Sequence, residues 1–205
     1  MENKHIYQEW LTLSQTVHSD NSIACFEEVE KHYTHVKRHY HTLTHIYSLF
    51  HQIMELKCSE AQKGLLAHAA LFHDVIYKAT AKDNELKSAQ FAALWLEKLG
   101  IDQESQETIT QLIIATASHT AHDPFIQLFL DMDLSILGAT SKRYYQYCDA
   151  IRNEYATIPT LLYKAGRKRF LKQLLSRDWI FQTKHFQVAF EEKARMNIQK
   201  ELKTL

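Results

Sequence analysis

The sequence predicts an all-α protein, for which the scarcity of glycine and proline and the helical spacing of apolar residues are the two reasons. Only 4 Gly and 2 Pro occur among 205 residues, too few to turn the many short strands of a sandwich or barrel, whereas long helices need little such punctuation. Hydrophobic residues at 45% and charged residues at 23% are typical of an ordinary globular protein. A chain of this length can bury a sizeable core, so we expect a single domain over residues 1–205.

Apolar residues at helical spacing, together with residues typical of helix ends, locate five helices in the first half of the chain. The first stripe advances by four, three and four residues and consists of Ile6, Trp10, Leu13 and Val17. Ser59 with Gln62 is a capping-box pattern that opens the fourth helix, and Gly100 ends the fifth. The expected ranges are about 6–17, 22–35, 42–57, 59–77 and 84–100.

The same signals predict five more helices in the second half. Asp123 followed by Pro124 supplies the N-cap and first residue of the seventh helix, which ends near Gly138. Ser141 and Thr160 open the eighth and ninth helices. The expected ranges are about 103–118, 125–137, 141–155, 160–176 and 186–205.

Charge, cysteine and hydropathy patterns exclude several classes of protein. Lys and Arg together number 24, as do Asp and Glu, so the strongly basic field of a nucleic-acid-binding protein is missing. The three cysteines have no CxxC spacing, which argues against a disulfide framework and a thiolate zinc site. The amino terminus lacks the pattern of a secretory signal, and no run of about 18 apolar residues occurs. We therefore expect a cytoplasmic protein that binds neither nucleic acid nor membrane.

Histidine is over-represented: the chain has 13, and eight of them lie between His32 and His73. Asp74 directly follows His73 near the end of an otherwise apolar predicted helix, so both side chains should be partly buried and need partners. Taken alone, a His-Asp dipeptide more often makes a hydrogen bond at the surface, or occurs by chance, than binds a metal ion. Imidazole and carboxylate together suit a divalent metal ion, and neighbouring helices can add ligands, of which His45 and Asp133 are the natural candidates.

The order of these residues adds a resemblance to a known family. His45 is followed after 28 positions by His73-Asp74 and after 59 more by Asp133, and this series resembles the H…HD…D signature of the HD superfamily of metal-dependent phosphohydrolases. The stretches RHYHTLTHI, LFHDVIY, DNELKSA, IIATASH and DMDLSILG, with the later GR and ARMN segments, look like one bacterial subfamily of predicted HD phosphohydrolases. The resemblance covers nearly the whole chain and implies an HD-domain helical bundle. It implies four metal ligands: His45, His73, Asp74 and Asp133.

The first ligand has an alternative in His41. This histidine precedes His45 by four residues, one helical turn if the helix already covers both, so either can be the ligand, or His41 can contact substrate. We prefer His45 because Ile46 and Leu49 anchor its register to the core.

The last ligand has an alternative in Asp131. Asp131 and Asp133 point about 200° apart on a helix, so only one of them can face the metal. In the resembled family the ligand is usually the second Asp of such a segment and is commonly followed by Arg. Here Leu134 follows, which leaves the role of that Arg unfilled.

Four further residues complete the expected site. His119 ends the sixth helix, where related enzymes often keep a histidine facing the metal cleft, and we assign it to phosphate contact or a second metal; the alternative is a solvent-exposed histidine. Glu85 is the candidate for orienting the metal-bound water or a histidine beside the ligands, and the alternative is helix capping by an acidic residue. Lys78 and Arg167 are candidate cations for phosphate binding, the latter because it falls in the Gly-Arg segment.

These residues together predict a metal-dependent phosphohydrolase that acts on a phosphate ester or anhydride, with a nucleotide as the expected small-molecule substrate. The mixture of histidine and carboxylate makes Mn²⁺ the first choice, with Fe²⁺, Co²⁺, Ni²⁺, Zn²⁺ or Mg²⁺ as other metal ions. A di-iron HD oxygenase is one alternative, with His41, Glu85 and His119 as additional ligands. A non-catalytic metal- or nucleotide-sensing module is another. We expect a monomer or a homodimer.

Overall fold

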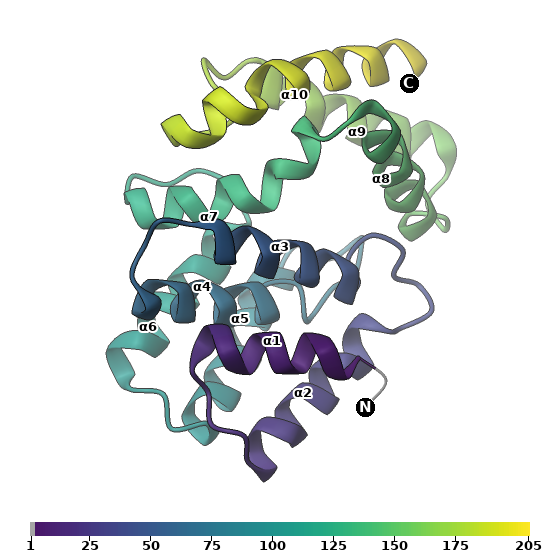
Figure 1. Ribbon diagram of the computed structural model, residues 1–205. Helices are drawn as coiled ribbons and strands as arrows, with labels where there is room; N and C mark the ends of the chain where they lie inside the picture. The colour runs from purple at the N-terminus through teal and green to yellow at the C-terminus, as the bar shows by residue number, and fades with distance from the viewer. Residues whose placement is uncertain (1–2) are drawn as a thin grey trace. The chain divides into compact units, whose positions relative to one another are not determined.

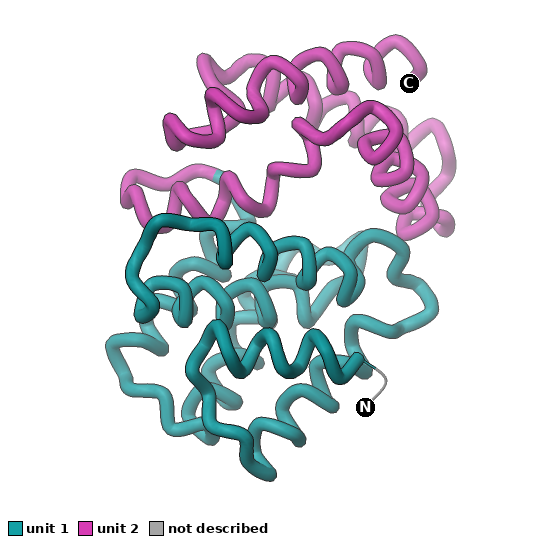
Figure 2. Tube along the Cα trace, in the orientation of Figure 1, with its two compact units in different colours: residues 1–119 teal, residues 120–205 magenta. Residues whose placement is uncertain are grey.

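The computed structural model describes residues 3–205, which form ten α-helices and one short 3₁₀ helix (Figure 1). No strand occurs among these residues, so the prediction of an all-α protein is confirmed. The chain divides into two compact units, one ending at His119 and the other spanning Thr120–Leu205 (Figure 2). The assignment of residues 1–205 to one domain stays a prediction.

The first unit contains six helices. They are α1 (Lys4–Ser14), α2 (Asp20–Tyr33), α3 (Leu43–Glu55), α4 (Glu60–Phe72), α5 (Asn84–Lys98) and α6 (Gln103–Ala115). The fourth, α4, is the central one because it packs against α1, α3, α5 and α6. Every residue from Leu66 to His73 is buried, and three alanines in this stretch let the neighbouring helices approach closely. The end of α4 therefore lies in the interior, where His73 and Asp74 follow.

Several helix ends in this unit agree with the sequence. Ser59 and Gln62 form the reciprocal capping box at the start of α4, and Asp102 accepts a hydrogen bond from the backbone of Ser105 at the start of α6. Gly100 follows α5 with a φ of 74°, in the left-handed region where only glycine is unstrained. Such caps contribute about 1 kcal/mol each and fix where the chain turns.

Several helices end earlier than their patterns predicted, and α1 and α4 show two reasons for this. Gln15 adopts a left-handed conformation that ends α1 at Ser14, and Val17 beyond it is 77% exposed rather than part of the apolar stripe. The helix expected over 59–77 ends at Phe72, and the chain continues as a turn although Val75 remains buried. Apolar residues in this turn still enter the core, so the apolar pattern did not show where the helix ends.

The second unit contains four α-helices and the 3₁₀ segment. These are α7 (Pro124–Leu134), η1 (Ser135–Gly138), α8 (Ser141–Glu154), α9 (Thr160–Leu175) and α10 (Lys184–Thr204). α10 packs on η1 and α9. The contact between α10 and η1 needs Gly138, because a Cβ atom there would lie 2.6 Å from Cβ of Phe190. Asn197 Nδ2 donates to the carbonyl oxygens of Leu137 and Ala139 and so fixes the same segment.

Candidate metal centre

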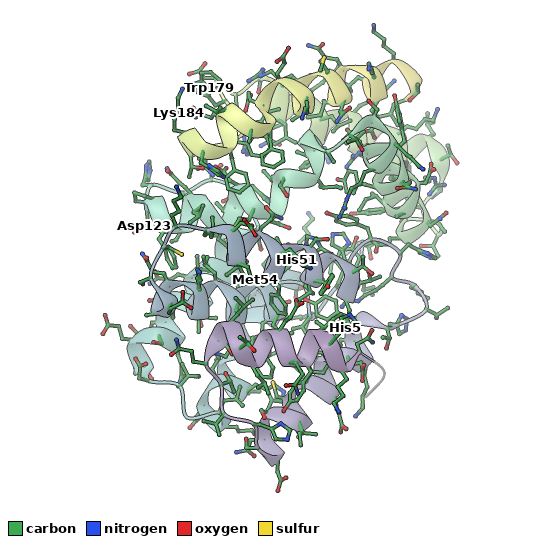
Figure 3. The ribbon with its side chains drawn as sticks, viewed as in Figure 1. His5, His51, Met54, Asp123, Trp179 and Lys184 are labelled. Atoms are coloured by element: carbon green, nitrogen blue, oxygen red, sulfur yellow. The ribbon has the colours of Figure 1, made fainter. Side chains whose placement is uncertain are left out.

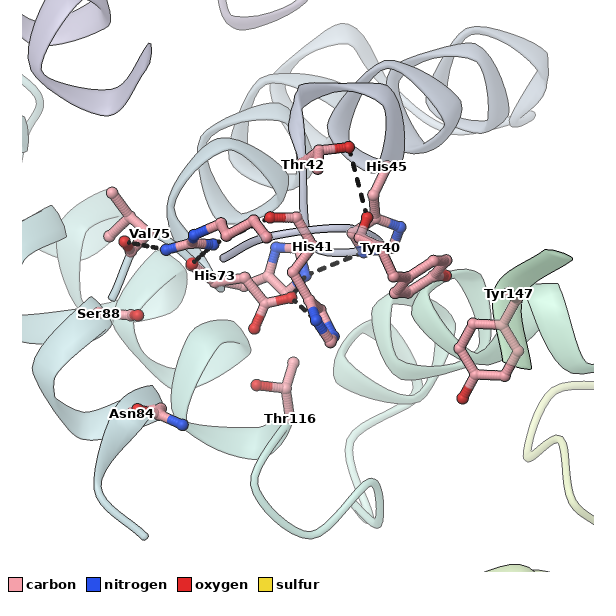
Figure 4. Close-up of polar contacts among 12 residues, drawn as sticks. Tyr40, His41, Thr42, His45, His73, Val75, Asn84, Ser88, Thr116 and Tyr147 are labelled. Carbon is pink, nitrogen blue, oxygen red and sulfur yellow. Dashed lines mark hydrogen bonds and ion pairs between the residues drawn. The ribbon is translucent and has the colours of Figure 1, made fainter. Parts of the chain in front are cut away.

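Three side chains of the first unit bring their donor atoms together where α3 meets the end of α4. The potential ligand atoms of His45, His73 and Asp74 all lie within 4.8 Å of one another. Figure 4 shows the two histidines, His45 and His73. Nε2 of His45 is 3.3 Å from Nε2 of His73, which is 3.0 Å from Oδ2 of Asp74. Both histidines are buried and Asp74 is partly buried. Among the residues from Asn3 to Leu205, these three form the one such group with ligand atoms close enough to share a metal ion.

Local structure explains why these three side chains converge. His45 occupies the first turn of α3, where the neighbouring Ile46 and Leu49 are fully buried and set the register of the helix. His73 is the C-cap of α4, and its backbone N–H still donates to the carbonyl of Ala69 as in the helix. The chain turns immediately afterwards, which brings the carboxylate of Asp74 back to the ring of His73.

A hydrogen bond sets the tautomer of His73. Nδ1 of this ring is 2.9 Å from the carbonyl oxygen of Ala70, which can only accept, so Nδ1 carries the proton. Nε2 of the neutral ring then presents its lone pair to His45 and Asp74. A backbone carbonyl bound to the second ring nitrogen is the usual arrangement around a metal-ligating histidine.

The donor set fits a divalent metal ion. Electron-rich atoms that converge in a buried place repel one another unless a proton or a cation lies between them. Neighbouring donors bound about 2.0–2.2 Å from one ion lie roughly 2.8–3.1 Å apart in octahedral geometry and roughly 3.3–3.6 Å apart in tetrahedral geometry. The separations of 3.3 Å and 3.0 Å on either side of His73 Nε2 agree with this spacing.

His41 lies beside the group rather than in it. It precedes the start of α3 at Leu43, so it does not share the helical face of His45. Its Nε2 atom is 3.8 Å from Oδ2 of Asp74, and its ring packs against Tyr77 with centroids 4.3 Å apart. Tyr40 lies 5.0 Å from the rings of both His41 and His45. This geometry favours His45 as the ligand and gives His41 a position at the rim.

The two aspartates of the second unit differ in their surroundings. Asp131 is fully buried on α7 and accepts three hydrogen bonds at 2.6–2.8 Å, from the backbone of Gln182 and from the backbone and hydroxyl of Thr183. Burial raises the pKa of its carboxyl group, and these hydrogen bonds oppose the rise. Asp131 thus stabilises the start of α10. Asp133 is half-buried on the same helix, and its assignment as the fourth ligand stays a prediction.

The other expected site residues occupy varied positions. Glu85 is half-buried in the first turn of α5, and Lys78 has an exposed side chain in the preceding loop. His119 is half-buried at the end of the first unit, with a left-handed φ of 48°. Glu85 and Lys78 are thus close in sequence to the turn that follows Asp74, and their roles stay predictions.

Arg167 has a well-defined set of partners in the second unit. It is buried on α9, where Nε and Nη2 donate to the two carboxylate oxygens of Glu201 at 2.8 Å and 3.1 Å. Nη1 donates to the hydroxyl of Tyr147 at 3.0 Å. These contacts give the buried guanidinium hydrogen-bond partners and an opposite charge, so its burial needs no phosphate group. A role of Arg167 in substrate binding stays a prediction.

Sequence reasoning missed three polar residues that contact the turn after Asp74. They are Arg38, Asn84 and Ser88, and their hydrogen bonds go to backbone atoms of residues 74–78. One signal was visible: Asn84 and Ser88 stand one helical turn apart in DNELKSA, one of the stretches that carry the resemblance, in which only Glu85 was assigned a role. No protein-family model, curated protein or solved structure matches the chain.

Proposed function

We propose that this chain is a metal-dependent phosphohydrolase that holds its ion through His45, His73 and Asp74. The observation that carries this proposal is the convergence of two imidazole nitrogens and one carboxylate oxygen at the end of α4. The resemblance of the ordered motifs to HD phosphohydrolases supplies the reaction class, cleavage of a phosphate ester or anhydride. A nucleotide is the proposed substrate, and Mn²⁺ is the proposed ion because histidine ligands suit it better than Mg²⁺.

A divalent ion held by these donors lowers the pKa of a water molecule and polarises a phosphoryl oxygen, which is the chemistry that hydrolysis near neutral pH requires. The side chains of the site hold the ion and orient the reacting groups. Asp74 supplies the negative charge, and the bond from His73 to the carbonyl of Ala70 keeps the ring in place. His41 is the proposed donor of a hydrogen bond to a phosphate oxygen; it lies 3.8 Å from Asp74, and its ring packs against Tyr77.

The expectation of a cytoplasmic protein remains part of the proposal. All three cysteines are free thiols in the structure, as a reducing compartment requires. In the described part of the chain, no helix has the length and apolar character needed to cross a membrane.

The test is release of phosphate and pyrophosphate from a nucleotide panel by chelator-stripped protein, with and without added Mn²⁺. We expect Mn²⁺-dependent release from at least one nucleotide, and its loss in Asp74→Ala. The matched control is His51→Ala, since His51 is an exposed histidine on the same helix as His45 (Figure 3). Equal turnover by Asp74→Ala would overturn the proposed site.

The donor set also favours one second candidate. Two histidines and one carboxylate with open positions are the ligands typical of non-haem Fe²⁺ oxygenases. The protein is reconstituted with Fe²⁺ under anaerobic conditions and then exposed to air. Its oxygen consumption distinguishes this function from hydrolysis. Bound iron, oxygen uptake and silence across the nucleotide panel would together favour the oxygenase; a second iron ion would need further ligands, for which His41, Glu85 and His119 are the candidates. One bound metal ion with neither activity would favour a sensing module.

A further inference from the structure

Arg38 connects the loop that precedes α3 with the turn that carries the ligand Asp74. Nη1 of its guanidinium donates to the carbonyl oxygens of His41 at 3.1 Å and Asp74 at 2.6 Å, and Nη2 donates to the carbonyl of Val75 at 2.7 Å. The guanidinium also lies over the ring of Tyr77, 5.6 Å from its centroid. One side chain thus joins the loop before α3 to the turn after α4, two segments 36 residues apart in sequence.

Two residues of α5 hold the rest of the same turn. Ser88 Oγ accepts from the backbone nitrogen of Ile76 at 3.1 Å and lies 3.2 Å from its carbonyl oxygen, to which it donates. Asn84 Oδ1 accepts from the backbone nitrogen of Lys78 at 3.0 Å, and its Nδ2 donates to the carbonyl of Lys78, also at 3.0 Å. Both side chains are buried.

The backbone of residues 74–78 is therefore held by side chains in place of a helix or sheet. Arg38, Ser88 and Asn84 satisfy backbone polar groups at four of the five positions. A turn with polar backbone groups at the edge of a core needs such partners, but water could supply many of them. Fixed side-chain partners hold the turn in one conformation, and the turn begins with a ligand, Asp74.

The chemistry of Arg38 supports a positioning role over phosphate binding. Its Nη1 atom uses both hydrogens on carbonyl oxygens, so the fork that would grip a phosphate is occupied. Three carbonyls at fixed places also require the planar, multidentate guanidinium, which the single ammonium of lysine does not reproduce.

We infer that Arg38, Asn84 and Ser88 are positioning residues for the metal centre: they hold the turn Asp74–Lys78 so that the carboxylate of Asp74 faces His45 and His73. This inference rests on the proposed metal site and explains how the geometry of that site is maintained. It also gives the DNELKSA segment a role that belongs to Asn84 and Ser88 and is separate from that proposed for Glu85.

The test measures Co²⁺ binding to chelator-stripped full-length protein by titration calorimetry and by visible absorption, which reports the coordination of the ion. Loss of the residues that orient metal ligands typically weakens binding by 10–100-fold. We expect Arg38→Lys to weaken Co²⁺ binding at least tenfold and to change the absorption band, while the helix content of the metal-free protein stays that of the wild type. Wild-type affinity and spectrum in Arg38→Lys would overturn the inference.

The matched control is Arg152→Lys. Arg152 makes contacts of the same kind in the second unit, donating to the carbonyls of Tyr155 and Ile158 and lying over the ring of Tyr163. Its replacement should leave the Co²⁺ affinity within about twofold, since it supports no proposed ligand. An equal loss in both variants would show a general effect of removing such an arginine and would overturn the inference.

Ser88→Ala keeps the inference testable if Arg38→Lys does not fold. This variant removes one hydroxyl from a buried position, and we expect Co²⁺ binding to weaken threefold or more; unchanged binding would contradict the inference. The readout is independent of turnover. Wild-type protein that binds Co²⁺ but hydrolyses no nucleotide would refute the proposed reaction and leave the inference intact, whereas protein that binds no Co²⁺ would refute both.

Discussion

Nδ1 of His73 lies 2.9 Å from the carbonyl oxygen of Ala70, in the last turn of α4, and this hydrogen bond determines which ring nitrogen faces the other two ligands. We predict that the neutral ring of His73 carries its proton on Nδ1. Long-range ¹H–¹⁵N correlation spectra of uniformly labelled metal-free protein, with His73→Gln used for assignment, measure the tautomer. A ring of His73 protonated on Nε2 alone would contradict the arrangement of lone pairs on which the metal centre depends.

Burial of His68 should make the protein less stable at acid pH. It is buried, it accepts a hydrogen bond from Nε1 of Trp10, and burial lowers its pKa from 6.5 to about 4. Between those pH values the unfolded chain binds a proton that the folded chain does not, so stability is full above pH 6.5 and falls as the pH drops towards 4. Each pH unit corresponds to about 1.4 kcal/mol, which gives a loss of about 3 kcal/mol over the whole window.

Urea denaturation at a series of pH values measures this effect against His68→Gln. The glutamine can still accept from Trp10 but does not titrate. We expect the difference in unfolding free energy between the two proteins to change by about 3 kcal/mol between pH 7 and pH 4, with the wild type losing more. If the unfolding free energies of the two proteins changed in parallel with pH, His68 would not titrate as its burial requires.

Arg167 and Glu201 form a buried ion pair, and breaking it should destabilise the protein. Burial opposes ionisation of Glu201, yet the hydrogen bonds and charge of Arg167 lower the pKa of its carboxyl group. Arg167→Met leaves that carboxylate buried without its cation, for which we expect a loss of about 3–5 kcal/mol. The double variant Arg167→Met with Glu201→Met should recover part of this loss. Denaturation curves measure the free energy of unfolding of each variant. A decrease below about 1 kcal/mol in Arg167→Met would contradict the pairing.

Gly138 and Gly166 allow a matched comparison of two glycines in the second unit. A Cβ atom at Gly138 would lie 2.6 Å from Cβ and 2.8 Å from the carbonyl oxygen of Phe190, so Gly138→Ala should cost about 1–3 kcal/mol. A Cβ at Gly166, inside α9, meets no atom within 4 Å, so Gly166→Ala should stabilise the protein by up to about 1 kcal/mol. Thermal melting of both variants checks the signs, and a stabilised Gly138→Ala would contradict the close contact of η1 with α10.

Features encoded by neighbouring residues could be predicted from the sequence. The helical class, the capping box at Ser59, the N-cap at Asp123 and the left-handed Gly100 depend on residues within a few positions of one another. The grouping of His45 with the His73-Asp74 pair was predicted as well, from the resemblance of the ordered motifs to the HD signature.

Contacts to distant backbone atoms could not be predicted in this way. The hydrogen bonds from Arg38 to the carbonyls of Asp74 and Val75 have no counterpart in a pattern of side chains, since every residue has a carbonyl. Asp131 accepts from Gln182 and Thr183, more than 50 positions later, so nothing near Asp131 in sequence showed that this carboxylate stabilises another helix. The end of α4 at Phe72 was hidden for a related reason: burial of the following turn depends on packing against other helices.

The most direct test of the central claim is the stoichiometry and affinity of Mn²⁺ binding to chelator-stripped protein. We predict that wild-type protein and His51→Ala bind Mn²⁺ with equal affinity, and that His45→Ala, His73→Ala and Asp74→Ala each lose this binding while keeping wild-type helix content. Loss in all three variants would establish that His45, His73 and Asp74 form one metal centre. Wild-type affinity in His73→Ala would contradict it, because Nε2 of His73 lies between the other two donors.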